Sequence, residues 1–125
     1  MIEDVTPPYE GRHLLADLKG CKGLDDLDLV DRALRAAVVV AGARLIDLRL
    51  HSFGKGHGVT GVALLAESHI SIHTWPEHGY AAIDIFLCGY RHDLDGALAC
   101  IKSFLQSEDA IVRVIERGFS CAPNI

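Results

Sequence analysis

The sequence predicts an α+β fold, a two-layer sandwich in which a mainly antiparallel sheet packs against two helices on one of its faces. Three observations lead to this prediction. Two segments carry apolar residues at helical spacing, several others alternate or are rich in β-branched residues, and the strand-like segments are mostly joined as hairpins. The chain has 125 residues, no internal repeat and no linker rich in Pro, Gly or Ser, so we expect one domain over residues 1–125.

The first half of the chain is expected to begin with a short apolar strand at His13–Leu18. An apolar stripe at helical spacing follows Asp25 and Asp26 and stops at Gly42, which predicts a helix that begins after the two aspartates and ends at the glycine. Arg44–His51 alternates between apolar and polar residues, the period of a strand with one buried face. The face expected to be buried carries Ile46, Leu48 and Leu50.

The second half is expected to supply the remaining strands and the second helix. Val59–Trp75 is β-rich, and Pro76–Tyr80 forms a turn into a further strand at Ala81–Cys88, which together predict a hairpin. A second apolar stripe follows the N-cap residue Asp93 and runs to Leu105. Ile111–Ile115 supplies a last strand.

Composition and charge exclude several classes of protein. Half of the residues are apolar and mean hydropathy is +0.23, so the chain is expected to fold. The net charge of −5, with basic residues spread along the chain, argues against a nucleic-acid partner and suits a cationic small molecule. The longest apolar tract is far shorter than the roughly 20 residues that span a membrane.

Cysteine usage and the start of the chain predict a location. The four cysteines are irregularly spaced and form no C-x-x-C pair, so neither a disulfide framework nor a zinc ribbon is expected. Residues 1–11 are acidic and lack the pattern of a secretion signal. We therefore expect a cytoplasmic protein with reduced thiols.

Most of the chemically suggestive side chains lie between Glu67 and Cys88. His69 and His73 suggest a metal site, but on a strand they lie about 13 Å apart, too far to hold one ion, so no metal is expected. Ser68, His73 and Asp84 are the residue types of a serine hydrolase, yet Ser68 lacks the G-x-S-x-G turn that such enzymes use.

The stretch from Glu67 to Gly89, together with Gly11-Arg12-His13 and Gly58-Val59-Thr60-Gly61, resembles the bacterial and archaeal S-adenosylmethionine decarboxylases. These are short, self-processing, pyruvoyl-dependent enzymes of polyamine synthesis. The resemblance implies that the Ser68 hydroxyl attacks the carbonyl of Glu67 and forms an ester, which eliminates and hydrolyses to leave a pyruvoyl group at residue 68. The products would be chains 1–67 and 68–125. The resemblance implies neither a metal cofactor nor pyridoxal phosphate.

The resemblance also implies roles for other residues. The pyruvoyl ketone would form a Schiff base with the amine of S-adenosylmethionine and accept the electrons released with carbon dioxide. Cys88 matches the residue that then protonates the carbanion, and His73 matches the acid and base of processing. Thr60 stands where we expect a serine and keeps the hydroxyl that assists processing.

The spacing of these residues predicts a geometry. A five-residue turn pairs Trp75 with Ala81, which places Ser68 opposite Cys88 at about 5 Å, with Asp84 on the same face. His73 is five residues beyond Ser68, hence about 16 Å away and on the other face of a regular strand. Either the strand bends, or a second copy supplies His73; we favour a dimer of cleaved α/β protomers with the site at their interface.

Substrate contacts are expected from Phe53, Trp75 and Glu77, which match residues that stack on adenine or hold ribose hydroxyls. For Trp75 a place in the core, and for Glu77 a solvated turn, are equally good interpretations. Two functional alternatives stay open. The same pyruvoyl chemistry could act on arginine or ornithine, or the chain could be a non-catalytic relative that binds nucleosides.

Overall fold

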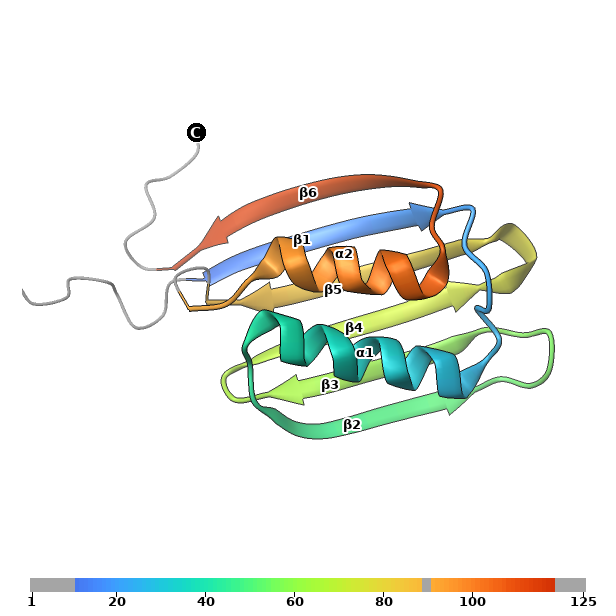
Figure 1. Ribbon diagram of the computed structural model, residues 1–125, viewed down its shortest axis with the longest axis horizontal. Helices are drawn as coiled ribbons and strands as arrows, with labels where there is room; N and C mark the ends of the chain where they lie inside the picture. The colour runs from blue at the N-terminus through green and yellow to red at the C-terminus, as the bar shows by residue number, and fades with distance from the viewer. Residues whose placement is uncertain (1–10, 89–90, 119–125) are drawn as a thin grey trace, which may run out of the picture.

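The computed structural model describes residues 11–88 and 91–118, and Figure 1 shows their arrangement. The elements follow in the order β1 (Gly11–Lys19), α1 (Leu27–Ala41), β2 (Leu45–Ser52), β3 (Val59–Leu65), β4 (Ser68–Trp75), the 3₁₀ turn η1 (Pro76–His78), β5 (Tyr80–Leu87), α2 (Leu94–Leu105) and β6 (Asp109–Arg117). The strands form one sheet in the order β2-β3-β4-β5-β1-β6. All five strand pairings are antiparallel, so the predicted α+β class is confirmed.

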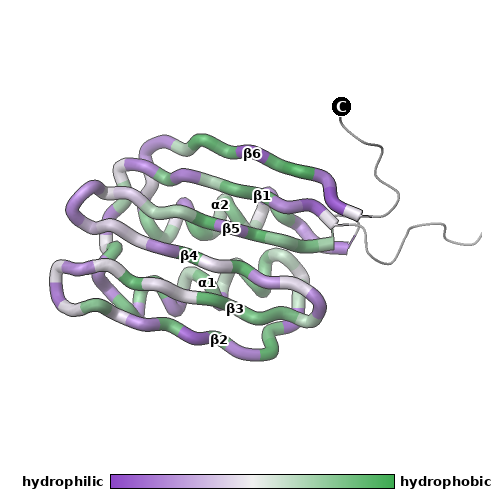
Figure 2. Tube along the Cα trace, turned by 180° about the vertical axis from the view of Figure 1, so that it is seen from behind, coloured by the Kyte–Doolittle hydropathy of each residue, from purple (hydrophilic) through white to green (hydrophobic). Residues whose placement is uncertain are grey.

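Both helices lie on the same face of the sheet, as predicted (Figure 1). That face carries the fully buried Leu14, Ile70, Ile72 and Ile85, because every second residue of these strands points at the helices. The opposite face, here called the open face, carries His69, Ser71, His73 and Asp84, and no described helix covers it (Figure 2). Neither described helix is both long and apolar enough to cross a membrane.

The helix ends form where the sequence predicts them. Asp26 and Asp93 cap α1 and α2, each accepting a hydrogen bond from a backbone N–H in the first turn, at 3.1 Å and 2.8 Å. Gly42 ends α1 in the left-handed region with φ 75°, where a residue without a Cβ carries no steric penalty. These predictions succeed because caps depend on a few neighbouring residues.

Two strands differ in detail from the prediction. Val59–Trp75 is two strands, β3 and β4, joined by the two-residue turn Ala66–Glu67. In β2 the pairing shifts between Leu45 and Asp47, so Ile46 is 61% exposed instead of buried with Leu48 and Leu50.

The register between β4 and β5 is one residue away from the prediction. Trp75 pairs with Tyr80 and not with Ala81, because the 3₁₀ turn and the left-handed Gly79 close the hairpin with one residue fewer. Continued to the strand end, this register places Ser68 opposite Leu87. Asp84 pairs with Ser71 and lies on the open face, so the prediction that it shares a face with Ser68 is wrong.

The hydrogen bond from Tyr80 to Asp17 at 2.6 Å links β5 to β1 and raises the pKa of Tyr80. Because the folded-state pKa is raised, the stabilisation is complete below the ordinary tyrosine pKa and is lost as pH rises through the folded value. We expect Tyr80→Phe to cost about 1 kcal/mol at pH 7, and the difference from wild type to vanish well above pH ~10. Urea unfolding at both pH values measures the difference in the free energy of unfolding between wild type and Tyr80→Phe. A difference that stays constant with pH would contradict this prediction.

Candidate active site

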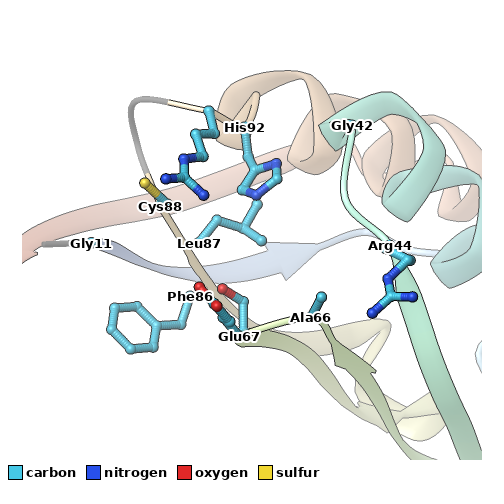
Figure 3. Close-up of a pocket in the computed structure, with 11 residues that line it drawn as sticks. Gly11, Gly42, Arg44, Ala66, Glu67, Phe86, Leu87, Cys88 and His92 are labelled. Atoms are coloured by element: carbon cyan, nitrogen blue, oxygen red, sulfur yellow. The ribbon is translucent and has the colours of Figure 1, made fainter. Parts of the chain in front are cut away.

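A cavity of about 720 Å³ opens at one end of the sheet, where the β3–β4 turn, the end of β5 and the segment after α1 meet (Figure 3). Its size is that of a pocket for a small organic molecule. Ser68 and Cys88, predicted to lie together, both line it. The full lining comprises Gly11, Gly42, Arg44, Ala66, Glu67, Ser68, Phe86, Leu87, Cys88, Arg91 and His92.

The Glu67–Ser68 peptide bond sits at a strained turn on the wall of this cavity. Leu65 pairs with Ser68, so only Ala66 and Glu67 connect the two strands. Glu67 has φ 75°, in the left-handed region, which costs a residue with a side chain on the order of 1 kcal/mol or more. The Ala66 N–H donates to the Arg44 carbonyl at 2.9 Å and fixes the turn against the start of β2.

Cys88 is the first residue beyond β5. Its carbonyl accepts hydrogen bonds from the N–H groups of Arg91 at 3.2 Å and His92 at 3.1 Å, which turns the chain toward α2. The strand pairing does not place Cys88 directly opposite Ser68. Both residues line the cavity because the β3–β4 turn and the end of β5 border it (Figure 3).

Three basic residues line this cavity together with Glu67. Arg44, Arg91 and His92 all belong to the lining, and the His92 ring nitrogen Nδ1 lies 3.3 Å from the Ala41 carbonyl at the end of α1. Sequence reasoning missed these three residues. They come from two different loops and carry no motif, so only the tertiary structure shows that they line the same cavity as Ser68.

The other predicted site residues lie toward the opposite end of the sheet. Thr60 and His73 are paired on β3 and β4, with their side chains on the open face and Thr60 Oγ1 3.3 Å from His73 Nδ1. Ser68 points to the helix side at the other end of β4, which runs from Ser68 to Trp75 as one unbroken strand. A bend that would bring His73 to Ser68 within one chain is therefore absent from β4.

Phe53, Trp75 and Glu77 lie at the same end of the sheet as His73, and none of them lines the cavity. Trp75 is 39% exposed and stacks on Tyr80 with ring centroids 5.1 Å apart, so the interpretation of Trp75 as a core residue is wrong. Phe53 is exposed beside His51, and Glu77 is exposed in η1. The eight predicted residues thus form two separate groups, one at each end.

The chain is similar to known proteins in both sequence and structure. A family model described as S-adenosylmethionine decarboxylase matches residues 12–118. An S-adenosylmethionine decarboxylase proenzyme of Methanococcus vannielii is 47% identical over 110 residues, which are 86% of this chain and 89% of the relative. One of Thermomicrobium roseum is 41% identical over 108 residues, 86% of this chain and 93% of the relative. The crystal structure of the adenosylmethionine decarboxylase from Aquifex aeolicus superimposes with a TM-score of 0.78 at 37% identity, covering 94% of this chain and 98% of that one.

Proposed function

Because this chain belongs to the S-adenosylmethionine decarboxylase family, whose members are carboxy-lyases, we propose that it decarboxylates S-adenosylmethionine with a pyruvoyl group made from its own Ser68. The product would be decarboxylated S-adenosylmethionine, the aminopropyl donor of spermidine synthesis. The observation that carries the proposal is the position of the Glu67–Ser68 bond, at a strained turn in the cavity that Cys88 also lines.

Self-processing begins when the Ser68 hydroxyl attacks the Glu67 carbonyl, so that the C–N bond breaks and a C–O ester bond forms. Loss of the Ser68 α-proton then expels the Glu67 carboxylate and leaves dehydroalanine at residue 68. Water replaces its nitrogen, which departs as ammonia. The left-handed Glu67 favours the first step, because breaking this peptide bond releases the residue from a turn that holds it under strain.

The cavity suits a pyruvoyl group at residue 68. Such a group supplies a carbonyl that draws in the electrons released when carbon dioxide leaves. The Cys88 thiol lines the same cavity and would return a proton to the substrate carbon. After cleavage Glu67 bears a second carboxylate, and Arg44 and Arg91 provide positive charge that would hold it at the cavity wall.

The two separate groups of site residues support a site built from two copies of the chain. Glu67, Ser68 and Cys88 lie at one end of the sheet, and Thr60 and His73 lie toward the other, on the open face. In two chains related by a two-fold axis, the Ser68 end of one copy can lie against the His73 end of its partner, and this contact occurs twice. We propose that the uncleaved chains already form a dimer, in which His73 of one copy, held by Thr60, exchanges protons during processing at Ser68 of the other. Processing then leaves a dimer of cleaved protomers.

The residues proposed to contact the substrate lie at the same end of the sheet as His73. Phe53 and Trp75 are exposed aromatic side chains at the same end, suited to stack on adenine and to face the sulfonium charge. Glu77, exposed in η1, is suited to accept hydrogen bonds from the ribose hydroxyls. All three would reach the cavity from the partner copy.

Replacing Cys88 by alanine should separate processing from turnover. We expect Cys88→Ala to cleave normally, because the thiol takes no part in ester formation, and to lose about 10²–10⁴-fold in decarboxylation rate with the proton donor gone. Intact mass reports cleavage and carbon dioxide release reports turnover. Cys100→Ala is the matched control, since Cys100 lies on α2 outside the cavity and burial raises its pKa. An uncleaved Cys88→Ala chain, or one with wild-type turnover, would contradict the assignment.

Two measurements test the proposed function: the masses of the purified chains and the release of carbon dioxide from different substrates. We expect the purified protein to give two fragments of 67 and 58 residues, the second blocked by a pyruvoyl group. Carbon dioxide release should be found with S-adenosylmethionine and not with arginine or ornithine. Release from either amino acid instead would favour the alternative substrate class, and an intact chain that binds nucleosides would identify a non-catalytic relative.

A further inference from the structure

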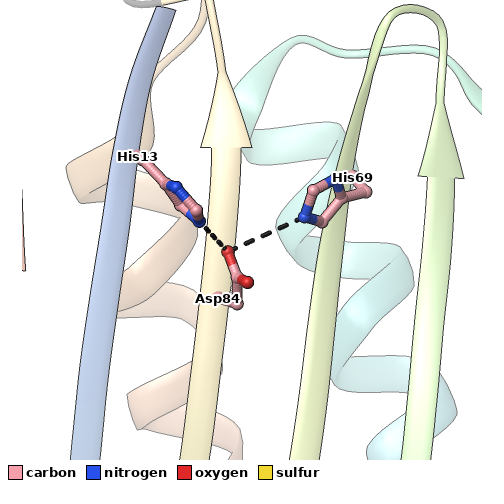
Figure 4. Close-up of side chains that lie close together, drawn as sticks. All are labelled: His13, His69 and Asp84. Atoms are coloured by element: carbon pink, nitrogen blue, oxygen red, sulfur yellow. Dashed lines mark hydrogen bonds and ion pairs between the residues drawn. The ribbon is translucent and has the colours of Figure 1, made fainter. Parts of the chain in front are cut away.

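Three side chains that the proposed reaction does not use converge on the open face (Figure 4). His13, Asp84 and His69 come from β1, β5 and β4, three adjacent strands with β5 in the middle. His13 and His69 both pair with Phe86 and therefore flank it, and Asp84 lies two residues along β5 on the same face. Neighbouring strands hold the three side chains, so their backbone positions are rigidly set.

The polar atoms of this cluster lie at distances suited to a shared ligand. His13 Nε2 is 2.5 Å and His69 Nε2 is 3.7 Å from Asp84 Oδ1, and all three atoms lie within 4.8 Å of one another. Their side chains are 19%, 37% and 33% exposed in the order His13, His69, Asp84. Across residues 11–88 and 91–118 this is the only group of three such ligands so close together.

The ligand set points to a particular class of ion. Two imidazole nitrogens and one carboxylate oxygen suit Zn²⁺, Co²⁺ and similar ions, whereas Mg²⁺ and Ca²⁺ prefer oxygen alone. Bonds of about 2.0 Å in a tetrahedron separate ligand atoms by about 3.3 Å, which small side-chain rotations achieve from the distances here. We propose that His13, His69 and Asp84 bind one divalent transition-metal ion, with water completing its coordination.

Arg117 competes with this ion. Its Nη1 lies 3.3 Å from His13 Nδ1, and its guanidinium lies 5.7 Å from the centre of the Phe86 ring. Arg117 donates to His13 Nδ1, which leaves the proton on Nε2 to be donated to Asp84. An ion on Nε2 moves that proton to Nδ1, so Arg117 must turn away. It can do so because it is an exposed side chain at the end of the edge strand β6.

This competition predicts opposite effects of two substitutions. His69→Ala removes a ligand and should weaken binding by at least ~10-fold. Arg117→Ala removes the competing cation and should tighten binding. His78→Ala is the matched control, because His78 is exposed on η1 and does not belong to the cluster.

The experiment uses tag-free protein that has been stripped with a chelator and alkylated at its thiols. Titration with Co²⁺ followed by visible absorption, and with Zn²⁺ by calorimetry, should show one ion per chain in wild type and in His78→Ala. Zn²⁺ should raise the melting temperature of these two proteins and have little effect on His69→Ala. Equal affinity of wild type and His69→Ala, or no ion bound to wild type, would overturn the proposal. None of these measurements depends on decarboxylation.

Discussion

Replacing Ser68 by alanine is expected to leave an intact chain of 13.6 kDa and to abolish decarboxylation. Alanine lacks the hydroxyl that attacks the Glu67 carbonyl, so no ester forms and residue 68 never becomes a ketone. The effect should be complete, because Ser68 is the only hydroxyl-bearing residue among the described residues that line the cavity. Denaturing electrophoresis and intact mass measure cleavage, and carbon dioxide release from S-adenosylmethionine measures activity.

Ser71→Ala is the matched control for this variant. Ser71 lies on the same strand three residues away, with its side chain on the open face opposite Asp84. We expect this variant to be cleaved and active. Cleavage of the Ser68→Ala chain at the same bond would show that another residue is the nucleophile.

Co-expressing Ser68→Ala and His73→Ala chains is expected to restore cleavage that neither variant shows alone. In a mixed dimer one site combines Ser68 of one copy with His73 of the other and is intact, whereas the second site lacks both residues. Only chains that carry His73→Ala should be cut. At equal expression and random pairing, about half of these chains should have the right partner.

Mass identifies the cut chain, because the fragment 68–125 should carry the His73→Ala change. Chains with distinct removable tags allow the mixed dimer to be isolated and demonstrated. Absence of cleavage in that isolated dimer would exclude donation of His73 by the partner. Cleavage of His73→Ala expressed alone would show that His73 is not required.

Much of the fold could be predicted from short stretches of sequence. Asp26, Gly42 and Asp93 bound the helices because a cap involves a side chain and backbone groups within one turn. The strands at Arg44–His51 and Ala81–Cys88 are recognisable because alternation reports one buried face. The incorrect predictions concern turns and bulges. One residue fewer in the turn between Trp75 and Tyr80 shifts the register of the whole β4–β5 pair. The shift in pairing between Leu45 and Asp47 exposes Ile46.

The candidate site could be predicted only in part, because local patterns identify residues within one segment but not which loops meet in space. Glu67, Ser68, His73 and Cys88 stand in one continuous stretch, so the sequence by itself determined which residues are suggestive and that His73 lies on the face away from Ser68. Arg44 and Arg91 join the cavity through loops that no local pattern describes.

Only the tertiary structure decided which distant segments meet. His13 and Asp84 are 71 positions apart in sequence, and they touch because β1 inserts between β5 and β6. Local propensities determine where a strand begins and which side chains share a face. The order of strands depends on how the two helices and the whole sheet bury their apolar surface together, which is a property of the complete fold and not of any one segment.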